Sequence, residues 1–395
     1  MKASLLCGAH YAGAEAHLQR PPVSPTLCDP EIAQHSFDRW LDYAALADQM
    51  GFDWISVSEH HYSPLILAPS VAPLAGALTQ IVRRARIALL GPLVSIANPV
   101  RIAEEIAMLD QLSHGRLVVL PLRGTPAEFN TYEPIDGSVT QGRAQEAARL
   151  IRKALAESEP FAWEGEFFRF PLIAIWPRPL QRPFPPMFFS GNSVNSAIFA
   201  AREHLGLCLS FHRPDTVASI VSAYRAEAMR RGWQPAPDDI VYRGFALLAD
   251  TDERAADLEP DFLPVTRRYL LAGPVPGPVL EPGGSQPASR MAAEHVGLFP
   301  PGRLLFAGSP ATVVERIRAF HELTGVGVLD LLFHSTHMSA EEVQHSIELF
   351  GRDVLPRIRE FGTEPPRRIS GNTRAEDQTG LGSEVYQARG ITGWR

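Results

Sequence analysis

Residues 59–61 of the chain place a carboxylate and two imidazoles side by side, as Glu59, His60 and His61. They follow directly on residues 54–57, a short apolar run with the composition of a buried strand. Histidine exchanges protons near neutral pH, which suits general acid–base work. Because α/β barrels present catalytic groups at the C-terminal ends of their strands, the tripeptide is a candidate for acid–base or metal chemistry.

The two histidines are expected to have different roles. Successive residues of a strand point to opposite sides, so His60 and His61 cannot both face a barrel axis if the strand continues through them. A histidine that packs at a strand end with a satisfied hydrogen bond is about as common as a catalytic one. Glu59 either orients an imidazole, caps a local donor or forms a salt bridge with an arginine.

The elements that position these residues alternate regularly along the chain. Apolar runs typical of strands cover residues 3–9, 54–57, 86–94, 117–120, 186–190, 205–211, 241–248 and 327–333. Apolar residues at three-and-four spacing predict helices over residues 37–50, 68–82, 99–112, 193–203, 214–231, 310–324 and 340–361. Eight strands that alternate with helices favour an α/β fold of the closed (β/α)8 TIM-barrel type over an open sheet.

Three segments interrupt this repeat. Residues 161–170 are expected to form a β-hairpin, and the proline-rich residues 177–186 are expected to lack regular structure. Residues 250–303 form a long insertion after the seventh strand, on the side of a barrel where lids are found. We expect one barrel domain over residues 1–362, including this insertion, and a polar tail over residues 363–395 that is disordered or docks on a neighbour.

Composition narrows the class of protein. The 395 residues, 45% of them hydrophobic, can bury one large core. A net charge of −7 with scattered basic residues argues against a nucleic-acid partner. Three distant cysteines, Cys7, Cys28 and Cys208, suit a reducing compartment. Without a signal-peptide pattern or a run of ~20 apolar residues, we expect a soluble, cytoplasmic protein with no membrane partner.

Two further motifs support the tripeptide. Residues 98–124 read NPVRIAEEIAMLDQLSHGRLVVLPLRG, with Pro99 at a helix start and Gly115 after the helix end. Residues 190–201 read SGNSVNSAIFAA. In this order and near this spacing, the three motifs resemble the bacterial luciferase-like monooxygenase family, and the resemblance covers most of the chain to about Gly362.

The resemblance implies a barrel that binds reduced flavin mononucleotide (FMN) at the C-terminal ends of its strands and uses dioxygen to oxygenate an organic substrate. By motif position His60 matches the catalytic histidine of the family, and Glu59 and His61 belong to the same motif. The resemblance also implies a homodimer. Since no Gly-x-Gly-x-x-Gly fingerprint follows a strand, reduced flavin would most simply come from a separate reductase.

The resemblance also assigns residues to the cofactor phosphate, namely Arg123, Gly191, Asn192, Ser193 and Ser196. An arginine can bind phosphate oxygens bidentately, and free amides at a helix N-terminus add donors. Taken singly, Ser193 is also explained as a plain N-cap, and Arg123 as an ordinary ion-pair partner.

The sequence departs from the family pattern at two positions. Asn98 stands where histidine also occurs, and it either contacts flavin or caps the following helix. Leu122 occupies the position where some luciferases carry a reactive cysteine, so thiol chemistry is not implied.

Three other functions remain open. A deazaflavin-using branch of the family shares the barrel and transfers hydride without dioxygen, although the EHH motif favours FMN. A non-catalytic flavin-binding relative would have lost the chemistry. A metal-dependent barrel hydrolase would need His10, His334 and His337 to converge with His60. The first strand lacks a His-x-His pair and Phe333–His334 replaces the carboxylate usual in the last strand, so we expect no metal.

Aromatic residues near the predicted strand ends suggest a mainly hydrophobic substrate pocket. They are Tyr11, Tyr62, Phe129, Tyr132, Phe211 and Phe245. Such residues are equally typical of an ordinary core, so the sequence names no particular substrate.

Overall fold

The computed structural model describes residues 1–14, 23–62, 64–126, 128–129, 131–132, 134–259, 306–334 and 338–362. His337, the predicted tail over residues 363–395 and most of the predicted insertion lie outside the described residues. The first part of that insertion, residues 252–259, is helical.

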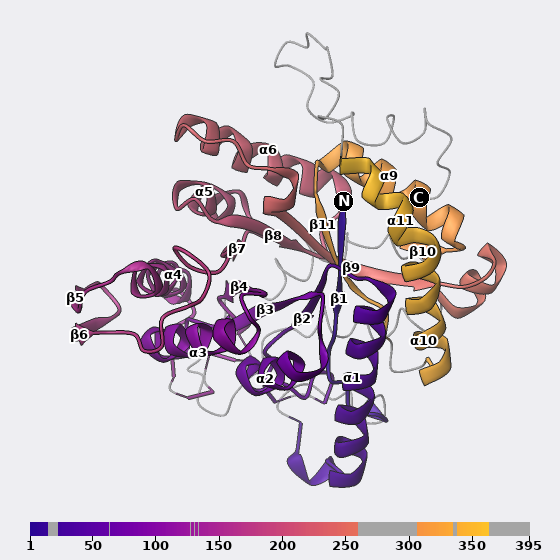
Figure 1. The fold of residues 1–395 in the computed structure, drawn as a ribbon, viewed down its shortest axis with the longest axis horizontal. Coiled ribbons are helices and arrows are strands. Elements are labelled where there is room, and N and C mark those ends of the chain that lie inside the picture. The colour runs from indigo at the N-terminus through magenta and orange to yellow at the C-terminus, as the bar shows by residue number, and fades with distance from the viewer. Residues whose placement is uncertain are drawn as a thin grey trace.

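Within the described residues, eight parallel strands follow one another in the order β4–β3–β2–β1–β11–β9–β8–β7 (Figure 1). Their bounds are β1 Lys2–Leu6, β2 Trp54–Val57, β3 Arg86–Leu93, β4 Leu117–Leu122, β7 Phe188–Ser190, β8 Gly206–Ser210, β9 Ile240–Leu248 and β11 Val328–Leu332. The ends of this order meet where Val119 of β4 pairs in parallel with Met187, directly before β7. The predicted (β/α)8 barrel is confirmed. A short strand, β10 (Phe306–Gly308), extends the pairing of β9.

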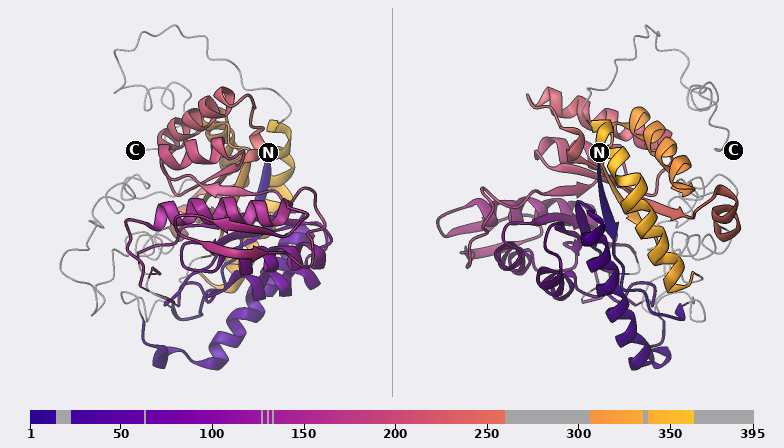
Figure 2. Two further views of the ribbon diagram at one scale, coloured as in Figure 1. Left: turned by 90° about the vertical axis from the view of Figure 1, so that its left-hand side faces the viewer. Right: turned by 45° about the vertical axis from the view of Figure 1, so that its right-hand side comes forward.

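Helices surround the strands on the outside (Figure 2). They are α1 Pro30–Met50, α2 Val71–Ile81, α3 Pro99–Leu112, α4 Thr140–Ala156, α5 Val194–Arg202, α6 Pro214–Arg230, α9 Pro310–Thr324, α10 Ala340–Leu349 and α11 Leu355–Arg359. Short 3-10 turns cover Pro25–Leu27, Pro237–Asp239 and Glu360–Gly362. No described helix is long and apolar enough to cross a membrane.

Two helix predictions need correction, and one helix was missed. Helix α1 begins at Pro30, not at residue 37, because Asp29 caps it by accepting from the amides of Glu31 and Ile32, and Pro30 suits the first turn. Helix α4 was not predicted. The helix expected over residues 340–361 is interrupted by a π-helical turn, Phe350–Val354, between α10 and α11.

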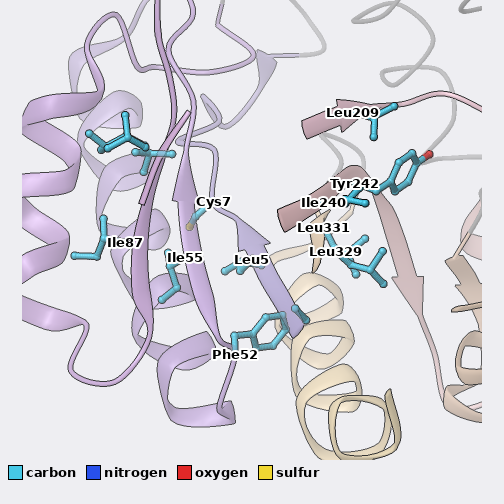
Figure 3. Close-up of a cluster of buried hydrophobic side chains, with 14 of the residues drawn as sticks. Leu5, Cys7, Phe52, Ile55, Ile87, Leu209, Ile240, Tyr242, Leu329 and Leu331 are labelled. Carbon is cyan, nitrogen blue, oxygen red and sulfur yellow. The ribbon is translucent and has the colours of Figure 1, made fainter. Parts of the chain in front are cut away.

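Two apolar clusters lie on the two sides of the strands. The larger one packs strand residues against the helices, and Figure 3 shows Leu5, Ile55, Ile87 and Leu329 as part of it. The smaller one draws on the alternate residues of the same strands, so it fills the barrel interior. Its members are Trp54, Ala88, Leu90, Val118, Leu120, Phe188, Cys208, Val241 and Val328.

The predicted hairpin is confirmed as β5 (Phe161–Glu164) paired antiparallel with β6 (Arg169–Ile173), outside α4 (Figure 1). Glu146 of α4 ties the hairpin to the barrel. Its carboxylate accepts 3.0 Å hydrogen bonds from Trp163 Nε1 and from the amides of Phe167 and Phe168. Burial raises the pKa of Glu146, but these hydrogen bonds outweigh burial and lower the pKa overall.

Replacing Glu146 by alanine should destabilise the protein by about 2 kcal/mol, because buried donors of the hairpin lose their acceptor. Urea unfolding at neutral pH measures the difference, and Glu159→Ala, at an exposed residue beside the hairpin, is the matched control. Since the carboxylate form is favoured in the fold, the difference should be full above about pH 4.5, the ordinary pKa of glutamate, and should shrink below it. Equal midpoints for the two variants would contradict this role.

Candidate active site

His60 stands at the C-terminal end of β2 and pairs with a carboxylate from another loop. Its Nδ1 lies 3.1 Å from Oε1 of Glu128, in the segment between β4 and α4. The side chain of His60 is 21% exposed, whereas that of Glu128 is 2% exposed. His60 is therefore reachable from the barrel mouth, while its carboxylate partner is held behind it.

Glu128 is itself held in place by Thr125. The second carboxylate oxygen accepts from the Thr125 amide at 2.7 Å and from the Thr125 hydroxyl at 3.0 Å. Burial raises the pKa of Glu128, but the bonds from His60 and Thr125 outweigh burial and lower the pKa overall. An ionised Glu128 can only accept, so Nδ1 of His60 is assigned as the donor.

The sequence analysis did not identify Glu128. A local signal was present, because Thr125-x-x-Glu128 has the spacing of a capping box, in which a glutamate accepts from the backbone amide three residues earlier. Nothing in that local pattern indicates a contact with His60, which lies 68 residues away in the chain.

His61 and Glu59 form a second, separate pair. His61 Nε2 lies 3.2 Å from Glu59 Oε1, and both side chains are buried. Burial raises the pKa of Glu59 in spite of its hydrogen bond with His61. The ring of His61 also meets Tyr132 edge-on, with 5.7 Å between ring centroids. Of the roles considered for Glu59, the described contacts correspond to the orientation of an imidazole, that of His61, and to a hydrogen bond with the backbone of Leu93.

A polar group lies inside the barrel beneath His60. Arg243 of β9 and Asp330 of β11 form an ion pair with 3.0 Å between Nε and Oδ2, and both side chains are buried. The hydroxyl of Ser56 donates to Asp330 at 2.7 Å. Ser58 Oγ lies 3.5 Å from Arg243 Nη1 and 3.5 Å from His60 Nε2. These polar side chains share the inner side of the strands with the apolar interior cluster.

Arg123 directly follows β4, and none of the described carboxylates forms an ion pair with it. It is half-buried, and burial lowers the pKa of its guanidinium. No carboxylate among the described residues lies within ion-pair distance of it. The alternative of an ordinary ion-pair partner is therefore not supported in the part of the chain that the structure describes.

The turn at residues 191–193 lies on the neighbouring strand, β7. Asn192 Oδ1 accepts from the amide of Ser210 at 2.8 Å, which ties the ends of β7 and β8 together. Ser193 caps α5, because its Oγ accepts from the amide of Ser196 at 3.3 Å. A side chain at Gly191 would collide with the end of the Leu207 side chain, so a larger residue here would require the buried Leu207 to move.

Hydrogen bonds through α4 connect Arg123 to the start of α5. The Ser95 hydroxyl donates to the carbonyl of Arg123, and the Ser95 carbonyl accepts from Arg143 Nε at 2.7 Å. In the same turn of α4, Gln141 Nε2 donates to Ser196 Oγ at 3.4 Å. The sequence analysis missed Gln141 and Arg143, since it did not predict α4. The structure thus brings the predicted phosphate residues to adjacent strand ends of one barrel edge.

Asn98 acts as a helix cap. Its Oδ1 accepts from the amides of Val100 and Arg101 at 2.9 and 3.3 Å, at the start of α3. Of the two roles predicted for Asn98, the helix cap is therefore present, and contact with a cofactor stays a prediction.

His10 and His334 stack on each other at the ends of the adjacent strands β1 and β11. Their ring centroids are 4.3 Å apart and the rings are nearly parallel, at 6°. Burial, with a smaller contribution from the nearby His60, lowers the pKa of His10 to about 4, and burial also lowers the pKa of His334. Among the described residues, no three His, Cys, Asp or Glu side chains gather around a point where a metal ion could sit.

The predicted pocket aromatics do not form one group. Phe129 and Phe245 are buried, and Phe211 stacks on Phe245 with 4.7 Å between centroids. Tyr62 and Tyr132 are exposed by 41% and 64%. Tyr11 and Tyr62 border a cavity in the described part of the chain, whose lining residues are Tyr11, Val23, Ser24, Pro25, Leu27, Cys28, Tyr62, Pro64 and Leu67.

Comparisons with known proteins identify relatives that match parts of this chain. The chain is 33% identical over 198 residues to the uncharacterized protein y4wF of Sinorhizobium fredii, and this match covers 50% of this chain and 56% of that protein. The chain thus spans little more than half the length of this relative. It is 26% identical over 276 residues to the FMNH2-dependent dimethylsulfone monooxygenase of Pseudomonas putida, covering 68% of this chain and 72% of that enzyme.

Among solved structures, the monooxygenase RslO1 from Streptomyces bottropensis superposes with a TM-score of 0.72 and 27% identity, over 90% of this chain and 99% of that one. A family model for luciferase-like monooxygenases matches residues 17–326, which is most of the chain. With the barrel and its motifs agreeing, this chain belongs to the luciferase-like monooxygenase family.

Proposed function

We propose that this protein uses reduced FMN and dioxygen to oxygenate a small, mainly hydrophobic organic molecule. The observation that carries the proposal is the pairing of two features at one end of the barrel. One is the half-buried guanidinium of Arg123, which has no counter-charge among the described residues, and the other is the His60–Glu128 pair. The first suits an anionic cofactor, and the second suits proton transfer.

The anion site fits a phosphate group. A half-buried cation without a carboxylate partner gains most from a bound anion, and guanidinium can donate two parallel hydrogen bonds to phosphate oxygens. The first amides of α5 have no acceptor within the helix and add a positive partial charge on the same barrel edge. Arg123, Gly191, Asn192, Ser193 and Ser196 would hold the phosphate.

Reduced flavin, when bound, supplies the electrons that activate dioxygen for oxygen transfer. The chain itself contributes the His60 imidazole, which is positioned to accept and donate a proton. Glu128 holds Nδ1 of His60 and stabilises a positive charge on the ring, so that Nε2 can take up or return a proton. The His61–Glu59 pair would support His60 from the outer side of the strand, behind the reaction site.

The proposal includes partners that follow from the same reasoning. A separate flavin reductase would supply the reduced cofactor, because the sequence has no dinucleotide fingerprint. A homodimer is proposed by resemblance to the family. The relative from Pseudomonas putida is named an FMNH2-dependent enzyme, which supports FMN over a deazaflavin as the cofactor here.

Replacing Arg123 by glutamine should weaken binding of reduced FMN by about 10- to 100-fold, the value of one or two charge-assisted hydrogen bonds. Anaerobic titration followed by flavin fluorescence or calorimetry measures this. Riboflavin, which lacks the phosphate, should bind the variant and the parent equally. The matched control is Arg101→Gln, at an exposed arginine of α3. Equal losses for FMN and riboflavin, or a parent that binds a deazaflavin but not FMN, would contradict the proposed site.

Replacing His60 by glutamine should lower turnover by about 100-fold or more while FMN affinity is retained, because the proton acceptor is lost and the phosphate site is not. Glu128→Gln should lower turnover by about tenfold. Turnover is measured with reduced FMN and labelled dioxygen against small sulfones, aldehydes and cyclic ketones, by label incorporation into product. His35→Gln, at an exposed histidine of α1, is the control. A His60 variant with parental turnover would refute the assignment.

A further inference from the structure

Four polar side chains, Ser56, Asp330, Arg243 and Ser58, form a connected column inside the barrel, where apolar packing does not require them. Arg243 and Asp330 sit on the inner side of β9 and β11, among the side chains of the apolar interior cluster. Taking two charges out of water costs free energy that their attraction recovers only with further hydrogen bonds. Here the further bonds are those from Ser56 to Asp330 and from Arg243 to the Leu90 carbonyl at 3.4 Å.

A buried ion pair of this kind is weak support for stability, because well-packed apolar residues do as well or better. Departures from apolar packing are expected at functional positions. The order of the residues along the column indicates that the functional position is at its His60 end. It begins at Ser56 and Asp330, passes through Arg243 and ends at Ser58, which lies next to His60.

Ser58 connects the ion pair to the imidazole. Its Oγ lies 3.5 Å from Arg243 Nη1 and 3.5 Å from His60 Nε2. Guanidinium nitrogens only donate, so the Ser58 oxygen accepts from Arg243 and its hydrogen is free to point at Nε2. On the other side of the ring, ionised Glu128 only accepts, from Nδ1. Both neighbours of the imidazole therefore select one tautomer, with the hydrogen on Nδ1 and the lone pair on Nε2.

The order carboxylate, imidazole, hydroxyl also occurs in serine hydrolases, where the hydroxyl is the nucleophile. That function does not fit Ser58. The residue is 2% exposed, and its oxygen already accepts a hydrogen bond from a cation, which weakens it as a nucleophile. The hydroxyl is placed to hold the ring.

We propose that Ser58, backed by the Arg243–Asp330 ion pair, is a positioning residue that acts together with Glu128 to fix the tautomer of His60 and to keep Nε2 as the basic nitrogen. Only the use of that nitrogen rests on the proposed function; the tautomer is a property of the protein without cofactor. The two statements can therefore fail separately.

Nitrogen NMR of the full chain with isotope-labelled histidine, without flavin, reads the tautomer directly. The His60 signals are assigned by their loss in His60→Gln. In the parent, they should report hydrogen on Nδ1. Because ionised Glu128 alone also favours this tautomer, Ser58 is tested in the Glu128→Gln background, where the glutamine side chain can either donate or accept. There Ser58→Ala should shift the signals to a mixture of the two tautomers, and Ser58→Thr, which keeps the hydroxyl, should retain the hydrogen on Nδ1. Ser4→Ala is the matched control, because Ser4 is a buried serine of β1 whose hydroxyl has no partner among the described residues.

The proposal is overturned if Ser58→Ala in the Glu128→Gln background keeps the parental tautomer while circular dichroism shows an intact fold, or if the parent carries its hydrogen on Nε2. If Ser58→Ala does not fold, Ser58→Cys replaces it, since a thiol is a much weaker donor. Turnover is the second readout: Ser58→Ala should lose about tenfold with FMN affinity unchanged. A shifted tautomer in a protein that oxygenates no test substrate would support the positioning role and count against the proposed function alone.

Discussion

The site depends on the two-residue alternation of strand β2. Trp54 and Ser56 point into the barrel and Ile55 and Val57 point toward the helices, and the contacts of the next residues continue this pattern. Ser58 and His60 therefore meet the interior column, whereas Glu59 and His61 pair with each other on the other side. A shift of one residue would place His61 over Arg243 and would move His60 away from Glu128. Since adjacent residues are held in opposite directions, one tripeptide supplies both a candidate reaction group and its support.

The proposed anion site depends on a second structural feature, the closure of the barrel. Arg123 and Gly191 are far apart in the sequence, yet closure sets β4 beside β7 through the pairing of Val119 with Met187. The same closure brings the first turn of α4 between the two strand ends, where Gln141 and Arg143 hold Ser196 and Ser95. An open sheet with the same elements would leave these groups on opposite edges.

Much of the fold was predictable because buried parallel strands are continuous apolar runs, and all eight strands were located from them. The helices over 99–112 and 310–324 were predicted to the residue, since proline marks each start. Helix α4 was missed although its apolar residues gather on one face, because the polar residues Thr140 and Glu146 lie on that same buried face and interrupt the apolar pattern. Glu128 and the Arg243–Asp330 pair were missed for another reason. Their contacts join residues 68 and 87 positions apart, and no local pattern records such a pairing.

The carboxylates of Glu59 and Glu128 have pKa values that are shifted in opposite directions, which bears on their roles. Burial dominates at Glu59 and raises its pKa, whereas the bonds from His60 and Thr125 prevail at Glu128 and lower its pKa. Where environments push the pKa values of two neighbouring acids apart, the acids are suited to different tasks. An ionised Glu128 stabilises positive charge on His60 and so supports proton uptake at Nε2. Glu59, whose charged form is disfavoured, stabilises a cation less well, so His61 is the poorer candidate for the same step. The directions of these pKa shifts therefore agree with the proposed role of His60, and they do so through Glu128, a residue that the motif does not contain.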